Sequence, residues 1–345
     1  MKIVHVFWAM LNGGIENMLV DIINLQIHQS NEVSVIVINN LIDNSIVDRL
    51  DNRCKLICLG RKKHSKSITF VFKLNYELLK QKFDVIHLHY DDIMKYIWIK
   101  GNYFTTVHNT HLPNHNFRWH KGIIAISRSV KEELDSYGFK QSVVINNGIN
   151  FSLIKHRNTI VNKTFNIVNV SRLVYTQKGQ DVLLKAIKIL KDRGYTNIHI
   201  DFIGDGENLQ DMEAYVSENN LSNIVSLLGN KNRSYIYQHL YEYDLFVQPS
   251  RFEGFGLTVV EAMAAYVPVL VSKNEGPLEI IEKGKYGYSF ENSNAEDCAN
   301  MIERIIANYP TAKFLARSYE HVKEIYDVKT TALKYLDFYK SNINR

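Results

Sequence analysis

Short apolar runs rich in Val and Ile alternate along the chain with longer segments in which apolar residues recur every three or four positions. In the first half, the short runs predict strands at 3–7, 33–38, 55–58, 85–89, 103–108, 123–126 and 143–146. Segments between them, such as 15–29 and 70–81, have the spacing of amphipathic helices. Strands separated by helices indicate βαβ units, so we expect a parallel sheet.

The same alternation begins again after a polar segment, 150–164, that has little periodicity. This second series predicts strands at 165–170, 198–203, 224–228, 245–248, 267–271 and 288–290, with helices that include 178–191, 209–219 and 257–265. Beyond residue 295 the pattern is helical to the end. We therefore predict an α/β protein of two Rossmann-like, doubly wound domains, 1–157 and 158–326, that face each other across a cleft. Ligands are expected at the carboxyl ends of the strands.

Composition and cysteine usage agree with a globular protein of two domains. The chain has 345 residues, of which 46% are hydrophobic and 22% are charged. It begins directly with a strand pattern, without the composition of a leader peptide, and no apolar run is long enough to span a bilayer. Cys54, Cys58 and Cys298 are odd in number and form no C-x-x-C pair, so we expect reduced thiols. These features predict a soluble, cytoplasmic protein.

Positive charge is concentrated in the first half of the chain. Residues 1–150 hold 18 Lys and Arg against 13 Asp and Glu, a net charge of +5, whereas residues 151–345 hold 23 against 23. The densest basic patch consists of Arg61, Lys62, Lys63 and Lys66, and it is followed by Ile68, Phe70, Val71 and Phe72. Two interpretations are open: a solvated loop that leads into a core helix, or a peripheral contact with the inner face of a membrane. No array of Arg and aromatic residues accompanies the patch, which argues against nucleic acid as a partner.

The segment 250–264 carries two carboxylates eight positions apart, Glu253 and Glu261. Gly254 and Gly256 predict a loop, and the following residues predict a helix that begins near Gly256. The N–H groups of Phe255 to Thr258 would then point out of the positive end of the helix, where an anion binds well. A loop of about three residues and one helical turn would separate the carboxylates by roughly 10 Å. This segment could hold both sugars of a sugar nucleotide, or it could be an amphipathic helix with a surface Glu at each end.

Three further motifs are expected at the carboxyl ends of the predicted strands. Arg172 follows the first strand of the second series, and Lys178 precedes its helix, so the two cations could clamp a diphosphate. Gly14 belongs to a glycine pair at the start of the first helix, which suits either a tight turn or the close approach of an anion. His108 ends a strand and could donate a hydrogen bond to a reacting sugar, or it could be a buried core histidine.

Metal ligation is not indicated by the pattern of histidines and carboxylates. His108, His111, His115 and His120 lie close together, but in an irregular segment without Asp or Glu. His87 and His89 alternate along a strand, and we expect their rings to face opposite ways. No Asp-x-Asp occurs, so a cationic clamp would have to replace a divalent ion at a sugar nucleotide.

The motifs in this order resemble the retaining family-4 glycosyltransferases of the GT-B fold, also called glycosyl transferases group 1. The residues that carry the resemblance span almost the whole chain: Gly13-Gly14, Asn147-Gly148-Ile149, Ser171-Arg172-Leu173, Lys178-Gly179, Glu253 and Glu261 within 249–261, and Gly276-Pro277 with Glu279-Ile280-Ile281. The resemblance implies a nucleotide-diphosphate sugar donor in the second domain, an acceptor in the first, and retention of the anomeric configuration. It also implies that a final helix, about 327–345, packs back on the first domain.

The resemblance also implies a role for each matching residue. Arg172 and Lys178 would hold the diphosphate, and Glu261 would bind the ribose hydroxyls. Glu253 and the backbone of Phe255, Gly256 and Leu257 would contact the donor sugar. Gly14 would approach the phosphate on closure, and His108 would lie near the sugar on the acceptor side. The departing phosphate is expected to take the proton of the acceptor, so no side-chain nucleophile is required.

The sequence thus predicts a metal-independent hexosyltransferase without a cofactor. Its donor would be a UDP-sugar carrying a hexose or an N-acetylhexosamine. Its acceptor would be a glycan or lipid-linked glycan, as in the synthesis of bacterial surface polysaccharides. Two alternatives are a sugar-nucleotide 2-epimerase of the same fold and a non-catalytic partner that binds sugar nucleotides.

Overall fold

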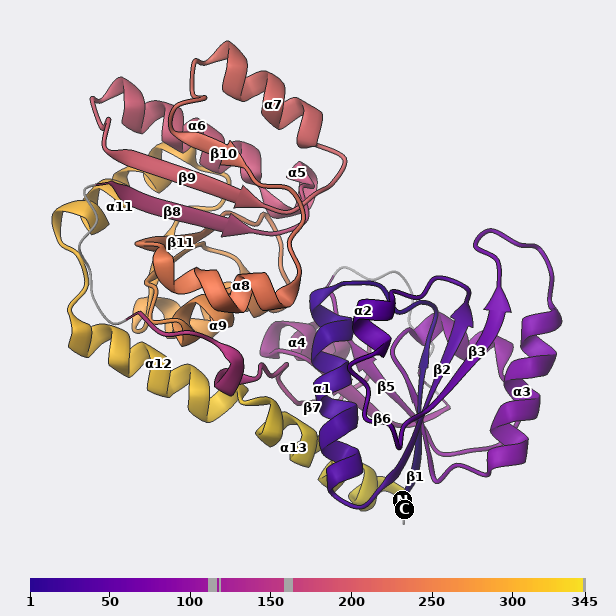
Figure 1. Cartoon of the computed structure of the whole chain (residues 1–345). Helices are drawn as coiled ribbons and strands as arrows, with labels where there is room; N and C mark the ends of the chain where they lie inside the picture. Colours follow the sequence, from indigo (N-terminus) through magenta and orange to yellow (C-terminus); the bar gives the residue numbers. More distant parts are fainter. Residues whose placement is uncertain (111–116, 118, 158–163, 344–345) are drawn as a thin grey trace. The chain divides into compact units, whose positions relative to one another are not determined.

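The protein folds into two compact α/β units (Figure 1). The structure is a computed structural model that describes residues 1–110, 117, 119–157 and 164–343. Unit 1 comprises Met1–Gly148 and Asp327–Arg345, and unit 2 comprises Ile149–Tyr326. Two parallel-sheet, Rossmann-like units confirm the predicted fold class. Among the described residues, no helix is both long and apolar enough to cross a bilayer.

Unit 1 is built on a seven-stranded parallel sheet, counted over its described residues, with the order β3-β2-β1-β4-β5-β6-β7. Its strands are β1 (Lys2–Phe7), β2 (Glu32–Asn39), β3 (Lys55–Arg61), β4 (Val85–Leu88), β5 (Tyr103–Val107), β6 (His120–Ala125) and β7 (Val143–Val144). The central strand β1 pairs with β2 on one side and with β4 on the other. The strand order therefore reverses between β1 and β4, which is where doubly wound sheets bind ligands.

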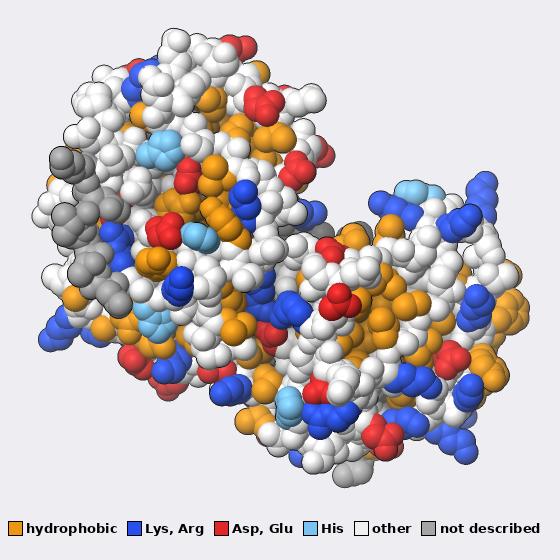
Figure 2. Space-filling model, in the orientation of Figure 1, with side chains coloured by type: hydrophobic (Ala, Val, Ile, Leu, Met, Phe, Trp, Pro, Cys, Tyr) orange, Lys and Arg blue, Asp and Glu red, His pale blue; other side chains and the backbone are white. Residues whose placement is uncertain are grey.

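The helices of unit 1 cover the sheet because each has one apolar face. They are α1 (Gly14–His28), α2 (Asn44–Val47), α3 (Thr69–Gln81), α4 (Arg128–Ser136) and α13 (Val328–Ile343), with a 3₁₀ turn η1 (Asp91–Tyr96). Helix α13 lies beside α1 and buries Tyr335 and Tyr339 (Figure 1). Helix α3 packs Phe70 and Leu74 into the core, while hydrophobic side chains remain visible on the edge of unit 1 that α3 occupies (Figure 2).

Unit 2 has a six-stranded parallel sheet over its described residues, with the order β10-β9-β8-β11-β12-β13. Its strands are β8 (Phe165–Val170), β9 (Ile198–Ile203), β10 (Val225–Leu227), β11 (Leu245–Gln248), β12 (Val269–Ser272) and β13 (Tyr288–Phe290). Its helices are α5 (Tyr175–Lys178), α6 (Gln180–Asp192), α7 (Leu209–Glu218), α8 (Arg233–His239), α9 (Leu257–Ala264), α10 (Glu275–Ile280), α11 (Ala295–Ala307) and α12 (Ala312–Tyr326). The order reverses between β8 and β11.

The main core of unit 2 lies between the sheet and helices α6, α7 and α11. Leu183 and Ile187 of α6 and Ile302 of α11 are fully buried there against Ile200 of β9. Helix α9 packs against α12 and contacts β11 and β12. This packing fixes the start of α9 next to the carboxyl end of β11, one of the two strands at the reversal.

Candidate functional site

Lys178 and Glu253 meet at the carboxyl edge of the unit 2 sheet, beside β8 and β11. The Lys178 ammonium donates to Glu253 Oε2 and forms an ion pair with it. Their side chains are only 14% and 15% exposed, so water screens the pair weakly. The sequence predicts that both residues bind the donor, but gives no sign that they contact each other. In the structure they form one charged centre.

A polar network below Glu253 holds its loop in place. Ser250 is fully buried, and its hydroxyl accepts from the Gln248 amide at 2.6 Å. Its carbonyl oxygen accepts from Asn274 Nδ2 at 2.6 Å and from the Ser272 hydroxyl. The carbonyl oxygen of Glu253 accepts from the Gly276 N–H at 3.1 Å. The loop is therefore bonded from both sides, and the position of the Glu253 carboxylate is defined.

Helix α9 begins at Leu257, as predicted, with Gly256 as its N-cap. Gly256 has φ +105°, a conformation that favours glycine, and no side chain caps the helix. The first hydrogen bond of the helix runs from the Val259 N–H to the Gly256 carbonyl oxygen at 3.0 Å. The N–H groups of Leu257 and Thr258 lie before it, at the positive end of the helix. The ring of Phe255 is buried against Tyr326, so only the backbone of Phe255 can serve a ligand.

Glu261 lies one turn along α9 and is 9% exposed. Burial raises the pKa of its carboxyl to about 7, although the charge of Arg233 and a hydrogen bond from Tyr237 oppose the shift. The Arg233 guanidinium lies over the Tyr237 ring, 4.6 Å from its centroid. Both residues belong to α8, a short helix that the sequence analysis missed. Asn232, which caps α8 by accepting from the Tyr235 N–H at 2.9 Å, was the available signal.

Arg172 follows β8 and is exposed. Among the described residues its side chain has no hydrogen bond or ion pair, while its carbonyl oxygen accepts from the Gln180 amide at 2.7 Å. The guanidinium therefore remains available at the strand-end loop, on the same edge as the charged centre. Gly204, which follows β9, packs against this loop: a Cβ there would lie 1.9 Å from the Ser171 carbonyl oxygen.

An ion pair that the sequence analysis missed fastens the Lys178 loop to the Glu253 loop. Arg251 donates to both carboxylate oxygens of Asp181 at 2.7 and 2.8 Å, which is a bidentate contact. The N–H of Arg251 also donates to the Gln177 carbonyl oxygen at 2.8 Å. Burial is the largest single influence on the Asp181 pKa and acts to raise it. The hydrogen bond and the charge of Arg251, together with Lys185, outweigh burial, so the pKa lies below its usual value. These contacts of Arg251 thus hold Lys178 close to Glu253.

Gly179 is required where these loops approach each other. Its φ is +65°, and a Cβ at this position would lie 2.1 Å from the Pro249 carbonyl oxygen. Gly194 gives a matched control, since its φ is +90° but a Cβ there meets nothing within 4 Å. Gly194→Ala is expected to cost about 1 kcal/mol of unfolding free energy, and Gly179→Ala at least about 3 kcal/mol. Urea denaturation checks both values, and equal costs would show that the close approach is unimportant.

The predicted residues of unit 1 lie at the carboxyl edge of its own sheet. Gly14 is exposed and is the first residue of α1, whose N-cap, Gly13, has no capping side chain. His108 follows β5, and both of its ring nitrogens are buried without a hydrogen-bond partner in the described structure. Burial lowers its pKa to about 4, so the ring is neutral at physiological pH.

His108 belongs to a row of imidazoles at the β1–β4 reversal. The rings of His5, His87, His89 and His108 follow one another with centroids between 4.5 and 5.8 Å apart. The expectation that His87 and His89 face opposite ways is wrong: their rings stack at 4.5 Å, because residues two apart on a strand share a face. His5 Nδ1 lies 3.0 Å from His89 Nε2, and His5 Nε2 lies 2.8 Å from Gln26 Oε1.

Hydrogen bonds also join His87 to the C-terminal helix α13. His87 Nδ1 bonds to the Tyr339 hydroxyl at 2.5 Å, and its Nε2 lies 2.9 Å from the Thr106 hydroxyl. The described residues contain no group of three His, Cys, Asp or Glu side chains placed to hold a metal ion. His111 and His115 lie outside the described residues.

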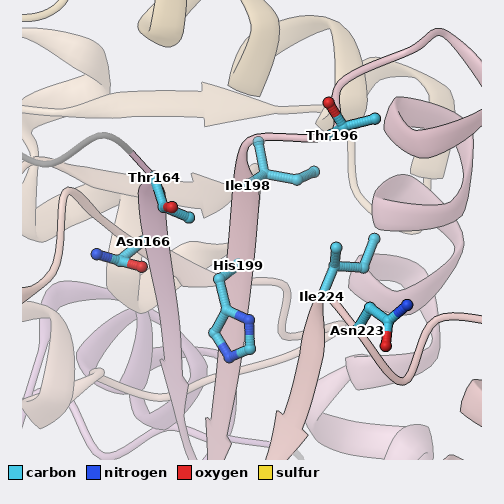
Figure 3. Close-up of a pocket in the computed structure, with 7 residues that line it drawn as sticks. All are labelled: Thr164, Asn166, Thr196, Ile198, His199, Asn223 and Ile224. Carbon is cyan, nitrogen blue, oxygen red and sulfur yellow. The ribbon is translucent and has the colours of Figure 1, made fainter.

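A separate pocket of about 520 Å³ lies in unit 2 at the amino ends of its strands (Figure 3). It is lined by Thr164, Asn166, Thr196, Ile198, His199, Asn223 and Ile224. The side chain of His199 is held by Ser226 at 2.9 Å and by Asp201 at 3.1 Å. This pocket is at the opposite edge of the sheet from Arg172 and Lys178, so it is not the predicted site.

Sequence comparison matches two family descriptions that together cover most of the chain. "Glycosyltransferase Family 4" matches residues 12–153, and "Glycosyl transferases group 1" matches residues 150–321. An uncharacterised glycosyltransferase of Methanocaldococcus jannaschii, MJ1178, is 32% identical over 246 residues, which are 70% of this chain and 64% of that protein. The poly(ribitol-phosphate) α-N-acetylglucosaminyltransferase of Staphylococcus aureus is 29% identical over 175 residues, 50% of this chain and 35% of that enzyme. The chain therefore matches less than two thirds of the length of either relative.

Solved structures with the same fold match nearly the full length of the chain. The Anabaena protein Alr3699/HepE, in complex with UDP and glucose, superposes with a TM-score of 0.84 at 20% identity, over 99% of this chain and all of that one. A glycosyltransferase of Rickettsia africae gives a TM-score of 0.81 at 20% identity, over 99% of this chain and 98% of that one. At this identity the likeness shows the fold.

Proposed function

The chain belongs to the group 1 glycosyltransferases of the GT-B fold, and from this premise we propose that it transfers a sugar from a nucleotide-diphosphate donor with retention of configuration. The proposed donor is a UDP-linked hexose or N-acetylhexosamine. The proposed acceptor is a glycan or a lipid-linked glycan. The S. aureus relative, named as an N-acetylglucosaminyltransferase, and the UDP-bound Anabaena structure support this choice of substrates.

The observation that carries the proposal is that Arg172, the Lys178–Glu253 ion pair and the start of α9 all lie at the same strand edge of unit 2. Two cations and a helix N-terminus favour a diphosphate there. A carboxylate beside them can accept hydrogen bonds from sugar hydroxyls. Because Glu253 Oε2 is already paired with Lys178, we propose that Oε1 faces the sugar. The same contact would align the ammonium with the phosphate.

In the proposed reaction, the bond between the sugar C1 and the phosphate oxygen breaks as a bond from the acceptor oxygen to C1 forms on the same face. The proton of the acceptor hydroxyl passes to the departing phosphate oxygen, and the products are UDP and the glycoside. Arg172, Lys178 and the N–H groups of Leu257 and Thr258 stabilise the negative charge that grows on the diphosphate. In this scheme no side-chain nucleophile and no divalent ion is needed. The roles predicted for His108 on the acceptor side and for Gly14 at the phosphate stay predictions.

The proposed function is tested by incubating the protein with UDP-sugars, with and without glycan acceptors, and in the presence of EDTA. Acceptor-dependent release of UDP that persists in EDTA, with a product of unchanged anomeric configuration by NMR, is the expected result. An epimerised sugar nucleotide from donor alone would instead identify a 2-epimerase. Binding of UDP-sugar without any turnover would identify a non-catalytic partner.

The raised pKa of Glu261 predicts that UDP affinity depends on pH. Ribose hydroxyls that donate to the carboxylate stabilise its charged form, so UDP binding should lower the Glu261 pKa from about 7 and release protons. Protonation competes with binding at low pH. The affinity for UDP should therefore rise by up to about tenfold from pH 6 to pH 8.

Isothermal titration calorimetry in buffers of different ionisation enthalpy measures both the affinity and the released protons. UDP itself titrates near this range, so the Glu261→Gln variant is the reference. The difference between the wild type and this variant isolates the contribution of Glu261. Identical pH profiles for the two proteins would exclude Glu261 as the ribose ligand.

A further inference from the structure

Helix α3 carries a stripe of large apolar side chains on the face that points away from the core. Ile68, Phe72, Tyr76 and Leu79 are 58% to 64% exposed, and their spacing along the helix places them on one side. Trp98, from the segment after η1, is 60% exposed and lies against Phe72, with ring centroids 5.4 Å apart. We call these five residues the α3 surface.

The fold of unit 1 does not need the α3 surface. Phe70, Val71, Leu74 and Leu78 on the other side of α3 already supply its contacts with the core. The outer face of a helix on a globular protein is ordinarily polar, and contiguous exposed apolar residues mark an interaction site. Two of the four apolar residues that follow the basic patch in the sequence, Phe70 and Val71, are thus core residues. The other two, Ile68 and Phe72, are exposed.

Lysines surround the α3 surface. Lys62, Lys63 and Lys66 are exposed in the connection between β3 and α3, Lys73 and Lys80 are exposed on α3, and Lys100 is exposed two residues after Trp98. Among the described residues, Lys62, Lys63 and Lys66 have no ion pair. Helix α3 has one acidic residue, Glu77, which is half-buried and bonded to Gln81 at 3.4 Å. The exposed ionised side chains of α3 and of the β3–α3 connection are therefore lysines, and the exposed carboxylate of Asp92 on η1 is paired with Lys95 at 3.6 Å.

Arg61 does not belong to this rim, although it is part of the basic patch in the sequence. Its guanidinium lies over the rings of Phe70 and Trp8, at 5.1 and 5.7 Å, and donates to Asn39 and to the Ser65 carbonyl oxygen at 2.9 Å each. Arg61 thus anchors the loop that presents the free lysines. Figure 2 shows Lys and Arg side chains next to hydrophobic ones along this edge of unit 1.

We propose that the α3 surface and its lysine rim dock unit 1 on an anionic lipid surface, with α3 lying in the plane of the interface. An apolar stripe a few residues wide enters the boundary between headgroups and acyl chains, and lysines beside it remain at the level of the lipid phosphates. Positive charge that encloses the stripe selects an anionic membrane over a neutral one. This proposal concerns a surface remote in sequence from the donor residues of unit 2, and it stands whether or not the proposed donor is correct.

Sedimentation with lipid vesicles tests the proposal on the full-length protein. We expect binding to vesicles of phosphatidylglycerol and phosphatidylcholine in equal parts, weak binding to phosphatidylcholine alone, and release at high salt. Lys62, Lys63 and Lys66 changed together to Gln should weaken binding by about fivefold for each lysine, on the order of a hundredfold in all. The matched control changes the exposed lysines Lys185, Lys283 and Lys313 of unit 2 to Gln and should bind normally.

The apolar stripe has its own test, which does not depend on charge. Phe72→Gln with Trp98→Gln should abolish most binding, whereas Leu153→Gln with Leu333→Gln, two leucines of similar exposure elsewhere, should not. On anionic vesicles the tryptophan emission of the wild type should shift to the blue, and Trp98→Phe should remove most of that shift. Because all these residues are exposed, circular dichroism should show an intact fold for each variant.

Three results would overturn the proposal. The first is the absence of binding to anionic vesicles, and the second is equal binding by the lysine variant and its control. The third is that the protein does not bind vesicles but forms a concentration-dependent dimer in light scattering, and that the Phe72→Gln variant is a monomer. That last result would assign the α3 surface to a second copy of the chain.

Discussion

Glu253→Gln is expected to lower kcat by at least about a hundredfold, the scale of one lost charged contact at a transition state. The substitution keeps the size of the side chain and its place above the Ser250 network. It removes the charge that holds the Lys178 ammonium, so both the sugar contact and the alignment of the cation are lost. The donor should still bind through Arg172 and the start of α9, so KM should change less than kcat.

Lys178→Ala should lower kcat by a similar factor and also weaken UDP binding, because its charge faces the diphosphate in the proposed complex. Since the two side chains form one pair, we expect their effects to be non-additive. The double variant should be little worse than either single variant. Initial rates with a saturating acceptor, combined with UDP affinities, measure all three.

The matched controls are Lys313→Ala on α12 and Glu213→Gln on α7, both exposed. They change the same charges away from the site and should leave kcat unchanged. Removing one member of a largely buried pair also destabilises the fold, so rates belong at temperatures where circular dichroism shows each variant folded. Near-normal turnover in both Glu253→Gln and Lys178→Ala would defeat the site assignment.

Unit 1 is expected to lose stability steeply as the pH falls from 7 to 5. Burial lowers the pKa of His5 and of His108 to about 4 each. It lowers the pKa values of His87 and His89 well below their usual range. The unfolded chain binds protons near pH 6.5, while the folded rings stay neutral. The contribution of the neutral rings to the free energy of unfolding is therefore fully present above about pH 6.5. Below this pH the contribution falls by up to about 1.4 kcal/mol per pH unit for each ring.

No carboxylate is hydrogen-bonded to these rings in the described structure; their partners are Gln26, Thr106, Tyr339 and one another. The four rings together should remove at least about 4 kcal/mol of unfolding free energy between pH 7 and pH 5. The raised pKa of Glu261 in unit 2 acts in the opposite direction, because a carboxyl that binds its proton more tightly when folded gains stability as the pH falls.

Tryptophan fluorescence separates these effects, because all three tryptophans of the chain, Trp8, Trp98 and Trp119, lie in unit 1. Urea titrations at several pH values give the slope of stability against pH. His5→Gln should be less stable at pH 7 but should have a shallower slope by about one proton. His64→Asn, at an exposed position with φ +61°, is the control and should keep the full slope. A wild-type slope that is flat between pH 7 and pH 5 would contradict the prediction.

Local sequence signals placed the elements that present the site. Gly256 and the Ala- and Leu-rich residues after it fixed the start of α9, because glycine conformation and helix propensity act over a few residues. The β-branched runs likewise placed β8 and β11, whose carboxyl ends carry Arg172 and lead into Ser250. The prediction that His87 and His89 face opposite ways was wrong, because residues two apart on a strand lie on the same face of the sheet.

The contacts within the site could not be obtained in the same way. Lys178 and Glu253 are 75 residues apart, and their ion pair exists because Arg251 grips Asp181 and because Gly179 leaves room for the Pro249 carbonyl oxygen. The neighbours of Glu261 come from α8, a helix of seven residues whose own pattern is too short to predict. These pairings depend on which loops the sheet order brings together.

The order of apolar and polar residues was sufficient for two Rossmann-like units, their strands and the loops that bear the candidate residues, because hydrophobic period and glycine conformation are properties of short segments. Packing decided which charged side chains contact each other, which histidine rings are buried from solvent, and which side of α3 stays exposed. Those outcomes follow from burial and from distances between residues far apart in the chain, and burial exists only once the sheets have assembled.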